Sequence, residues 1–140
     1  MFRIRHRVAR KKRYVRHAIP FYLAALPAVS IIVIGFFYLV APGRMTGSFG
    51  LKPPAPDVGT RAWLRLKGNR DIVSGLVVLA VMLVGDARLV GIVLLVSAIV
   101  PLGDMSIVLV SGGSKSKAIS IHGATCAVML VVGLFLIHAI

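Results

Sequence analysis

The chain has 140 residues, of which 58% are hydrophobic, and it carries a formal net charge of +13. This hydrophobic fraction and the mean hydropathy of +0.92 exclude an ordinary water-soluble fold, because soluble domains contain only about 45–50% apolar residues. The length indicates a single domain.

A basic tail, residues 1–18, precedes the first apolar segment. Basic residues beside a transmembrane helix favour the cytoplasmic side and attract anionic lipid headgroups, at about 1 kcal/mol each near the surface. This position predicts a cytoplasmic tail in contact with lipid and argues against a nucleic-acid partner. Its basic residues are Arg3, Arg5, Arg7, Arg10, Lys11, Lys12, Arg13 and Arg16.

Four apolar segments follow, and each predicts a transmembrane helix, because about 20 helical residues cross a hydrocarbon core. The predicted spans cover residues 19–40, 64–84, 89–110 and 118–139. The second segment is uncharged only from Ile72 to Val84. The predicted helix therefore extends back toward Trp63, which draws Arg70 and Asp71 into the membrane.

Proline and glycine residues mark breaks in this pattern. Pro27 predicts a kink in the first span, and Pro101 in the third span frees the carbonyl of Ser97. The connection 41–61 is rich in both residue types, which predicts an irregular loop. The connections 85–88 and 111–117 are short and require antiparallel neighbours.

These features predict an all-α membrane protein, folded as an antiparallel bundle of four transmembrane helices over residues 19–140. The basic tail precedes the first helix, which usually sets orientation, so both termini of this multi-pass protein are predicted to be cytoplasmic. Cys126 is the single cysteine and has no partner for an internal disulfide. No cofactor is expected, since no zinc, haem or thiol-redox spacing occurs.

Ionisable side chains inside the predicted spans suggest a site, because charges at membrane depth are costly and face the bundle interior. Counted at about 1.5 Å per residue, Asp71 lies about 9 Å, Asp104 about 10 Å and His122 about 6 Å from the same membrane surface. Arg70 is adjacent to Asp71. We therefore expect these four side chains to form one polar layer, open toward the non-cytoplasmic side.

Two interpretations of this layer stay open. In the first, Arg70, Asp71, Asp104 and His122 bind a small amphipathic or lipid-like molecule, and the last three are candidate acid–base catalysts. In the second, they form a buried ion-pair network in a noncatalytic membrane subunit or scaffold. A cavity beside Asp104 and His122 favours the first. The Arg70 cation disfavours a metal site, and neither enzyme activity nor oligomeric state follows from the sequence.

Three short motifs link the chain to a known family. They are Gly68–Asp71 with Gly75, Pro101–Asp104 and Ile121–Gly123. With them the chain, over roughly residues 20–140, resembles a family of small four-helix integral membrane proteins of unknown function that is loosely similar to DoxX-type membrane proteins. The resemblance implies a four-helix bundle in a membrane, and it implies no reaction, substrate or catalytic residue.

Overall fold

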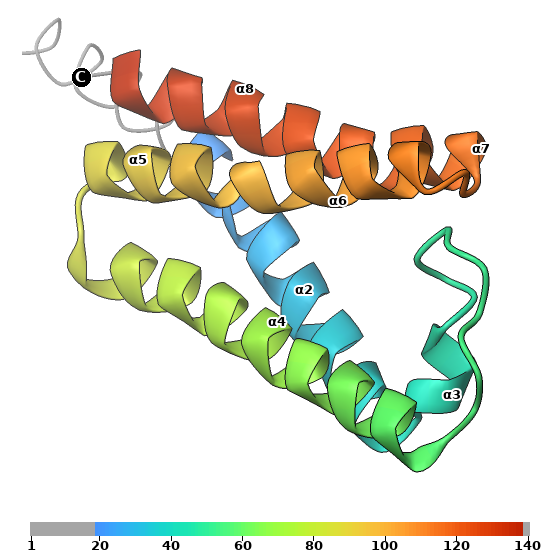
Figure 1. The fold of residues 1–140 in the computed structure, drawn as a ribbon. Helices are drawn as coiled ribbons and strands as arrows, with labels where there is room; N and C mark the ends of the chain where they lie inside the picture. Colours follow the sequence, from blue (N-terminus) through green and yellow to red (C-terminus); the bar gives the residue numbers. More distant parts are fainter. Residues whose placement is uncertain (1–18, 139–140) are drawn as a thin grey trace, which may run out of the picture.

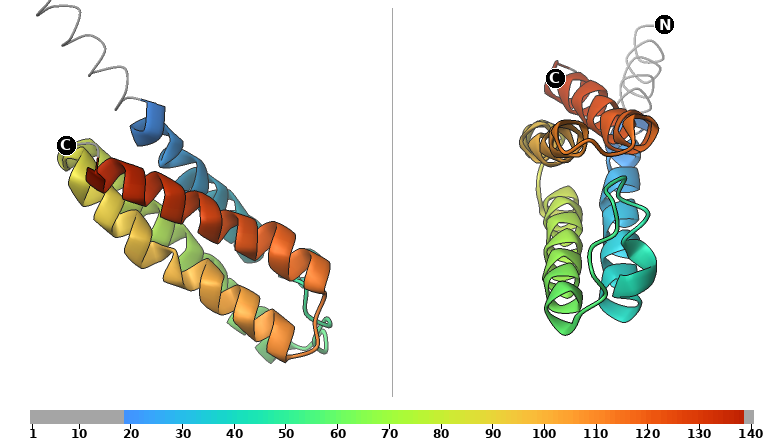
Figure 2. Two further views of the ribbon diagram at one scale, coloured as in Figure 1. Left: turned by 90° about the horizontal axis from the view of Figure 1, so that it is seen from above. Right: turned by 45° about the vertical axis from the view of Figure 1, so that its right-hand side comes forward.

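The computed structural model describes residues 19–138, and all regular elements in this range are helical. Two helix pairs build the fold (Figures 1 and 2). The first pair consists of α2 (Ala25–Val40) and α4 (Val58–Val84), joined through the short α3 (Pro42–Met45) and a loop. The second consists of α5 (Ala87–Ser97) with α6 (Ile99–Val110), packed against α7 (Lys115–Lys117), η1 (Ala118–Gly123) and α8 (Ala124–His138). The predicted tail lies outside the described residues.

Glycine residues allow the helices within each pair to approach closely. A Cβ atom added to Gly68 would lie 2.6 Å from the carbonyl oxygen of Gly35, and one added to Gly75 would lie 2.5 Å from that of Ala28. In the second pair, a Cβ atom on Gly91 would lie 2.8 Å from the carbonyl oxygen of Gly133. The backbones are therefore in contact in both pairs, as small residues permit between transmembrane helices.

The two pairs meet in a small core at one end and separate toward the other. Figure 1 shows them diverging toward α3 and the loop that follows it. Buried residues of α2, α4, α5 and α8, together with Ala24 and Ala98 beside them, form the core. The core residues are Ala24, Ala28, Val78, Val90, Leu94, Ala98, Cys126, Met129, Val132 and Leu136.

Three helical stretches are long and apolar enough to cross a membrane, not the expected four: Ile19–Val40, Ala87–Val110 and Lys115–His138. Their outward surfaces are apolar, as at Val110, which is 89% exposed. The remaining long helix, α4, falls short because charged residues occupy its first half. These residues are Arg61, Arg65, Lys67, Arg70 and Asp71.

Helix α4 also begins earlier than predicted. Asp57 caps its N-terminus by accepting a hydrogen bond of 2.7 Å from the backbone N–H of Thr60. This bond and a second one from the Thr60 hydroxyl hold the pKa of Asp57 below its usual value. The cap adds a polar turn ahead of Trp63, so α4 extends beyond the apolar segment on which the predicted span was based.

The helical rods are irregular at three places. The helix that starts at Ile19 is interrupted at Ala24, shortly before Pro27. The break between α5 and α6 follows Ser97, whose carbonyl loses its helical partner at Pro101, as predicted. The segment Ala118–Gly123 is a π-helix, which the sequence analysis did not predict and which often marks a functional site.

The glycine contacts lead to a stability prediction. Gly68→Ala or Gly75→Ala should lower the free energy of unfolding by about 1–3 kcal/mol, because each new methyl group would overlap a backbone oxygen of α2. Gly103→Ala in α6 is the matched control, since nothing lies within 4 Å of its added Cβ atom. Thermal melting in detergent would test this, and equal melting temperatures for the three variants would contradict it.

Candidate functional site

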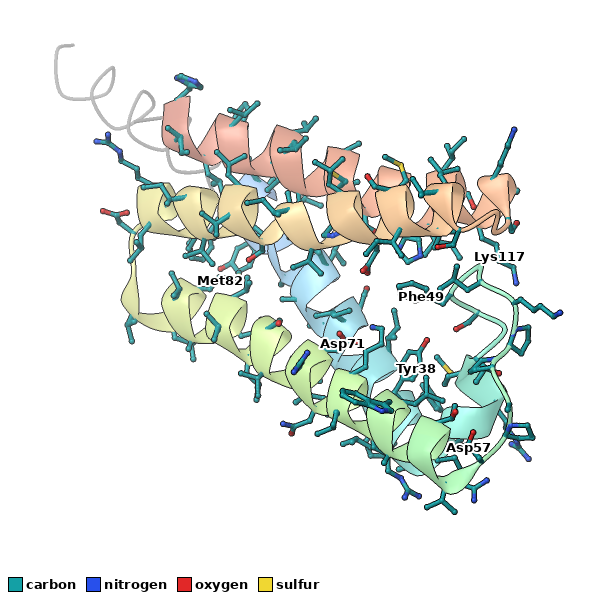
Figure 3. The ribbon with its side chains drawn as sticks, in the orientation of Figure 1. Tyr38, Phe49, Asp57, Asp71, Met82 and Lys117 are labelled. Atoms are coloured by element: carbon teal, nitrogen blue, oxygen red, sulfur yellow. The ribbon has the colours of Figure 1, made fainter. Side chains whose placement is uncertain are left out.

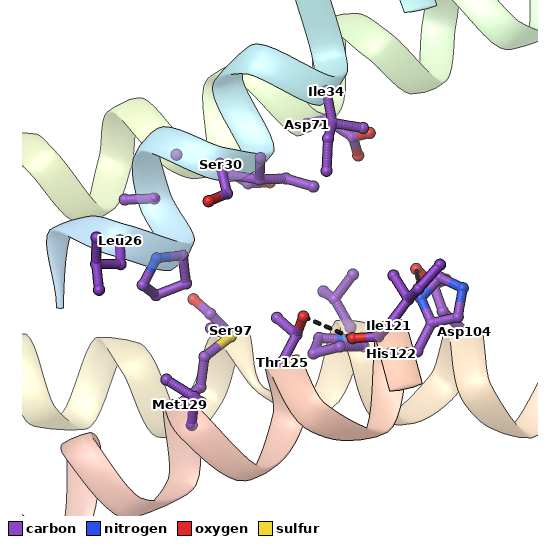
Figure 4. A pocket seen from close by; sticks show the side chains of 18 of the residues that line it. Leu26, Ser30, Ile34, Asp71, Ser97, Asp104, Ile121, His122, Thr125 and Met129 are labelled. Carbon is purple, nitrogen blue, oxygen red and sulfur yellow. Dashed lines mark hydrogen bonds and ion pairs between the residues drawn. The ribbon is translucent and has the colours of Figure 1, made fainter. Parts of the chain in front are cut away.

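A cavity of about 570 Å³ lies between the two helix pairs. Residues of α2, α4, α5, α6, η1, α8 and the loop after α3 line it, and Figure 4 shows their side chains facing the opening from both pairs. Its volume lies within the range of about 300–1,000 Å³ that is typical of small-molecule sites. The separation of the pairs thus leaves room for a ligand.

Charged and polar side chains gather at one end of this cavity. Asp71 lines it from α4, Asp104 from α6 and His122 from η1. In Figure 4, Asp71 faces Asp104 and His122 across the opening. The structure therefore brings three of the four sequence-predicted site residues to one cavity.

The fourth predicted residue, Arg70, does not join them. Its side chain is exposed, and it does not line the cavity. The cation of the cluster is Lys67, whose Nζ lies 2.6 Å from Oδ2 of Asp71. The reason is helical spacing, because residues four apart share a helix face whereas adjacent residues point about 100° apart.

Lys67 has aromatic partners as well. Its Nζ lies 4.9 Å from the ring centroid of Tyr38 and 5.2 Å from that of Phe49, within the range of cation–π attraction. Asp71 is only 8% exposed, so its negative charge is removed from solvent. The ion pair and the two rings together stabilise the charges of Lys67 and Asp71.

His122 is held in place by the loop after α3. Its Nε2 lies 3.0 Å from the backbone oxygen of Phe49, and the two ring centroids are 4.6 Å apart. Its Nδ1 lies 3.8 Å from Oδ2 of Asp104. The imidazole is 7% exposed, so Phe49 and Asp104 largely determine its chemistry.

The loop that carries Phe49 is attached to the turn between α6 and α7. The carbonyl of Gly50 accepts a hydrogen bond of 2.8 Å from the N–H of Ser114, and the Nζ of Lys117 donates one of 2.5 Å to the carbonyl of Gly47. Gly50 has a φ of +100°, a conformation that favours glycine. Figure 3 shows Phe49 and Lys117 near the polar end of the cavity.

The other end of the cavity is apolar. Leu26 of α2, Val78 of α4, Leu94 of α5 and Met129 of α8 line it. From Tyr38 to Leu26 the lining follows α2 for about 18 Å, at 1.5 Å per residue. The cavity is therefore amphipathic along its length, with the hydroxyl of Ser30 between the two ends and that of Ser97 beside Met129 (Figure 4).

Within residues 19–138, no group of three or more His, Cys, Asp or Glu side chains is placed to hold a metal ion. At the polar end, the carboxylate of Asp104 and the imidazole of His122 are groups capable of hydrogen bonding and proton transfer. Asp71 is less available, because Lys67 occupies one of its carboxylate oxygens.

Sequence reasoning missed Lys67, Tyr38 and Phe49 as site residues. The spacing of Lys67 and Asp71, four residues apart on one helix, was a usable signal. Phe49 had no such signal, since only the docked loop brings it to His122.

Comparison with known families gives one match. A family model described as Domain of unknown function (DUF4267) matches residues 28–136, a range that covers most or all of each helix in the two pairs and all of the cavity lining except Leu26 and Pro27. No curated protein and no solved structure matches the chain.

Methionine substitutions at Lys67 and at Arg70 test which of these two cations pairs with Asp71. Lys67→Met should lower the free energy of unfolding by about 1–3 kcal/mol, because it leaves the buried Asp71 carboxylate without its partner. Arg70→Met should change it by less than about 0.5 kcal/mol, as expected for an exposed side chain. Adding Asp71→Leu to Lys67→Met should restore part of the loss. A larger effect of Arg70→Met in detergent melting would contradict the observed pairing.

Proposed function

The chain belongs to the DUF4267 family, whose function is unknown, and we propose that it is a membrane protein that binds a small amphipathic, lipid-like molecule between its two helix pairs. The observation that carries this proposal is the cavity itself. It is apolar along most of its length and ends at Asp71, Asp104 and His122. A similarity to DoxX-type membrane proteins stays a prediction from sequence motifs.

We further propose that α4 crosses the membrane with the three more apolar helices. The loop after α2 is bonded to the turn after α6 through Gly50 and Ser114, so these two connections lie at the same end of the fold (Figure 1). Helices α2 and α6 both end at this end of the fold. Helix α4 must therefore run from this end to the opposite one, where α5 begins. Its cations Arg61 and Arg65 lie in its first turns, where long side chains extend to the membrane surface.

This topology has a direct test. Single cysteines at position 6 and at Ser114, in a Cys126→Ala background, should react with an impermeant thiol reagent from opposite sides of the membrane. With a cytoplasmic tail, Ser114 should then be labelled from outside. Labelling of both sites from the same side would mean that α4 does not cross. The contact of the tail with anionic lipid stays a prediction as well.

The cavity argues for ligand binding over a purely structural role. A structural ion-pair network would be packed on all sides, because a buried charge needs several partners. Here Lys67 and Asp71 form one pair, while Asp104 and His122 lie on the other wall with open space between the walls. Whether the protein also converts its ligand depends on Asp104 and His122, which we propose as the acid–base candidates.

Ligand binding can be tested by filling the cavity. Val128 lines the cavity and Val131, on the same helix, does not. A hexadecanol that carries a mid-chain diazirine should crosslink to the cavity residues Leu94 and Met129. Val128→Trp should reduce this crosslinking by about tenfold or more, since it removes the space for the chain, whereas Val131→Trp should leave it unchanged. Crosslinks restricted to outward-facing residues, in wild type and both variants, would refute the proposal.

A further inference from the structure

The hydrogen bond between His122 and the loop determines which atoms remain for a ligand. A carbonyl oxygen only accepts hydrogen bonds, so Nε2 of His122, at 3.0 Å from the backbone oxygen of Phe49, carries a hydrogen. A neutral imidazole has a single N–H group, so its Nδ1 is then an acceptor. The loop thereby sets the tautomer of His122.

The Nδ1 atom faces a second acceptor. Oδ2 of Asp104 lies 3.8 Å from it, too far for a direct hydrogen bond. No residue in the range 19–138 donates a hydrogen bond to the Asp104 carboxylate, whose side chain is 29% exposed along the cavity wall. Two acceptors thus stand side by side with no donor between them.

The charges around this gap favour a cation. Lys67 is already paired with Asp71 at 2.6 Å, so with His122 neutral the four groups sum to −1, from one lysine and two aspartates. An anionic head group would add to an excess of negative charge in a region of low dielectric constant. A head group with a positive charge and several N–H donors would neutralise the excess and bond to both acceptors.

We propose that the ligand carries a protonated primary amine, and that this ammonium group lies between Oδ2 of Asp104 and Nδ1 of His122. The inference rests on the proposed function and adds the class of head group to it. An ammonium group has three donors and no acceptor, which matches two acceptors 3.8 Å apart. Its apolar chain then extends toward Leu94 and Met129.

Four diazirine probes with the same chain separate the contributions of charge and donors. Hexadecylamine supplies both, hexadecyltrimethylammonium supplies charge without N–H donors, hexadecanol supplies a donor without charge, and hexadecanoate supplies a negative charge. Half-maximal crosslinking to the cavity should need at least about tenfold less hexadecylamine than any of the other three probes. The reason is that charge-assisted hydrogen bonds are roughly twice as strong as neutral ones. This comparison uses the wild-type protein and does not depend on any variant.

Two variants test whether Asp104 causes the preference for hexadecylamine. Asp104→Asn should bring hexadecylamine to the level of hexadecanol, whereas Asp86→Asn should not, since Asp86 caps α5 and does not line the cavity. Native mass spectrometry of the purified protein distinguishes the two sources of a primary amine, a free long-chain amine and the head group of phosphatidylethanolamine.

Other outcomes overturn the inference in distinguishable ways. Equal cavity crosslinking by all four probes would mean that a proton or water already bridges Asp104 and His122, and it would leave the proposed function intact. Preferential crosslinking of hexadecanoate would show that the cluster attracts anions. Absence of cavity crosslinks with every probe would refute the proposed function together with the head-group assignment.

Discussion

The structure depends on one constraint, that a polar group removed from water among apolar helices needs a partner within the protein. Most polar side chains in the helices obey it locally. The hydroxyls of Ser74, Ser106 and Thr125 each donate a hydrogen bond to the carbonyl four residues earlier. Lys67 and Asp71 satisfy each other one turn apart. After these pairings, Asp104 is the charged group on the cavity wall that lacks a hydrogen bond among the described residues.

Helix packing explains why there is a cavity beside that carboxylate. Gly68 and Gly75 bring α4 into backbone contact with α2, and Gly91 and Gly133 do the same for α5 and α8. Between the pairs, larger side chains such as Leu94 and Met129 contribute to the core and also line the cavity. Tight contacts within each pair and looser contacts between pairs produce an elongated space between the helices.

The loop after α3 completes the polar end. It contributes Phe49, whose ring lies near the Lys67 ammonium group and whose carbonyl oxygen lies within hydrogen-bond distance of His122. Lys67 and His122 belong to helices on opposite walls of the cavity. Its attachment at Ser114 and Lys117 makes the orientation of His122 dependent on a segment far away in sequence. The loop therefore acts on both the electrostatics and the tautomer of the site, as loops held on a rigid scaffold often do.

The sequence by itself determined the helical class and three of the four predicted spans as helices apolar enough to cross a membrane, and it placed Asp71, Asp104 and His122 at one site, because apolar run length and helical rise are local quantities. It also indicated that Pro101 leaves the carbonyl of Ser97 without its helical partner, since a missing N–H acts within one turn. It did not determine the choice of Lys67 over Arg70, the π-helix that holds His122, or the position of Phe49. Only the tertiary structure decided these, because each depends on which helix face meets which neighbour and on a loop whose docking partners lie 64 to 73 residues further along the chain.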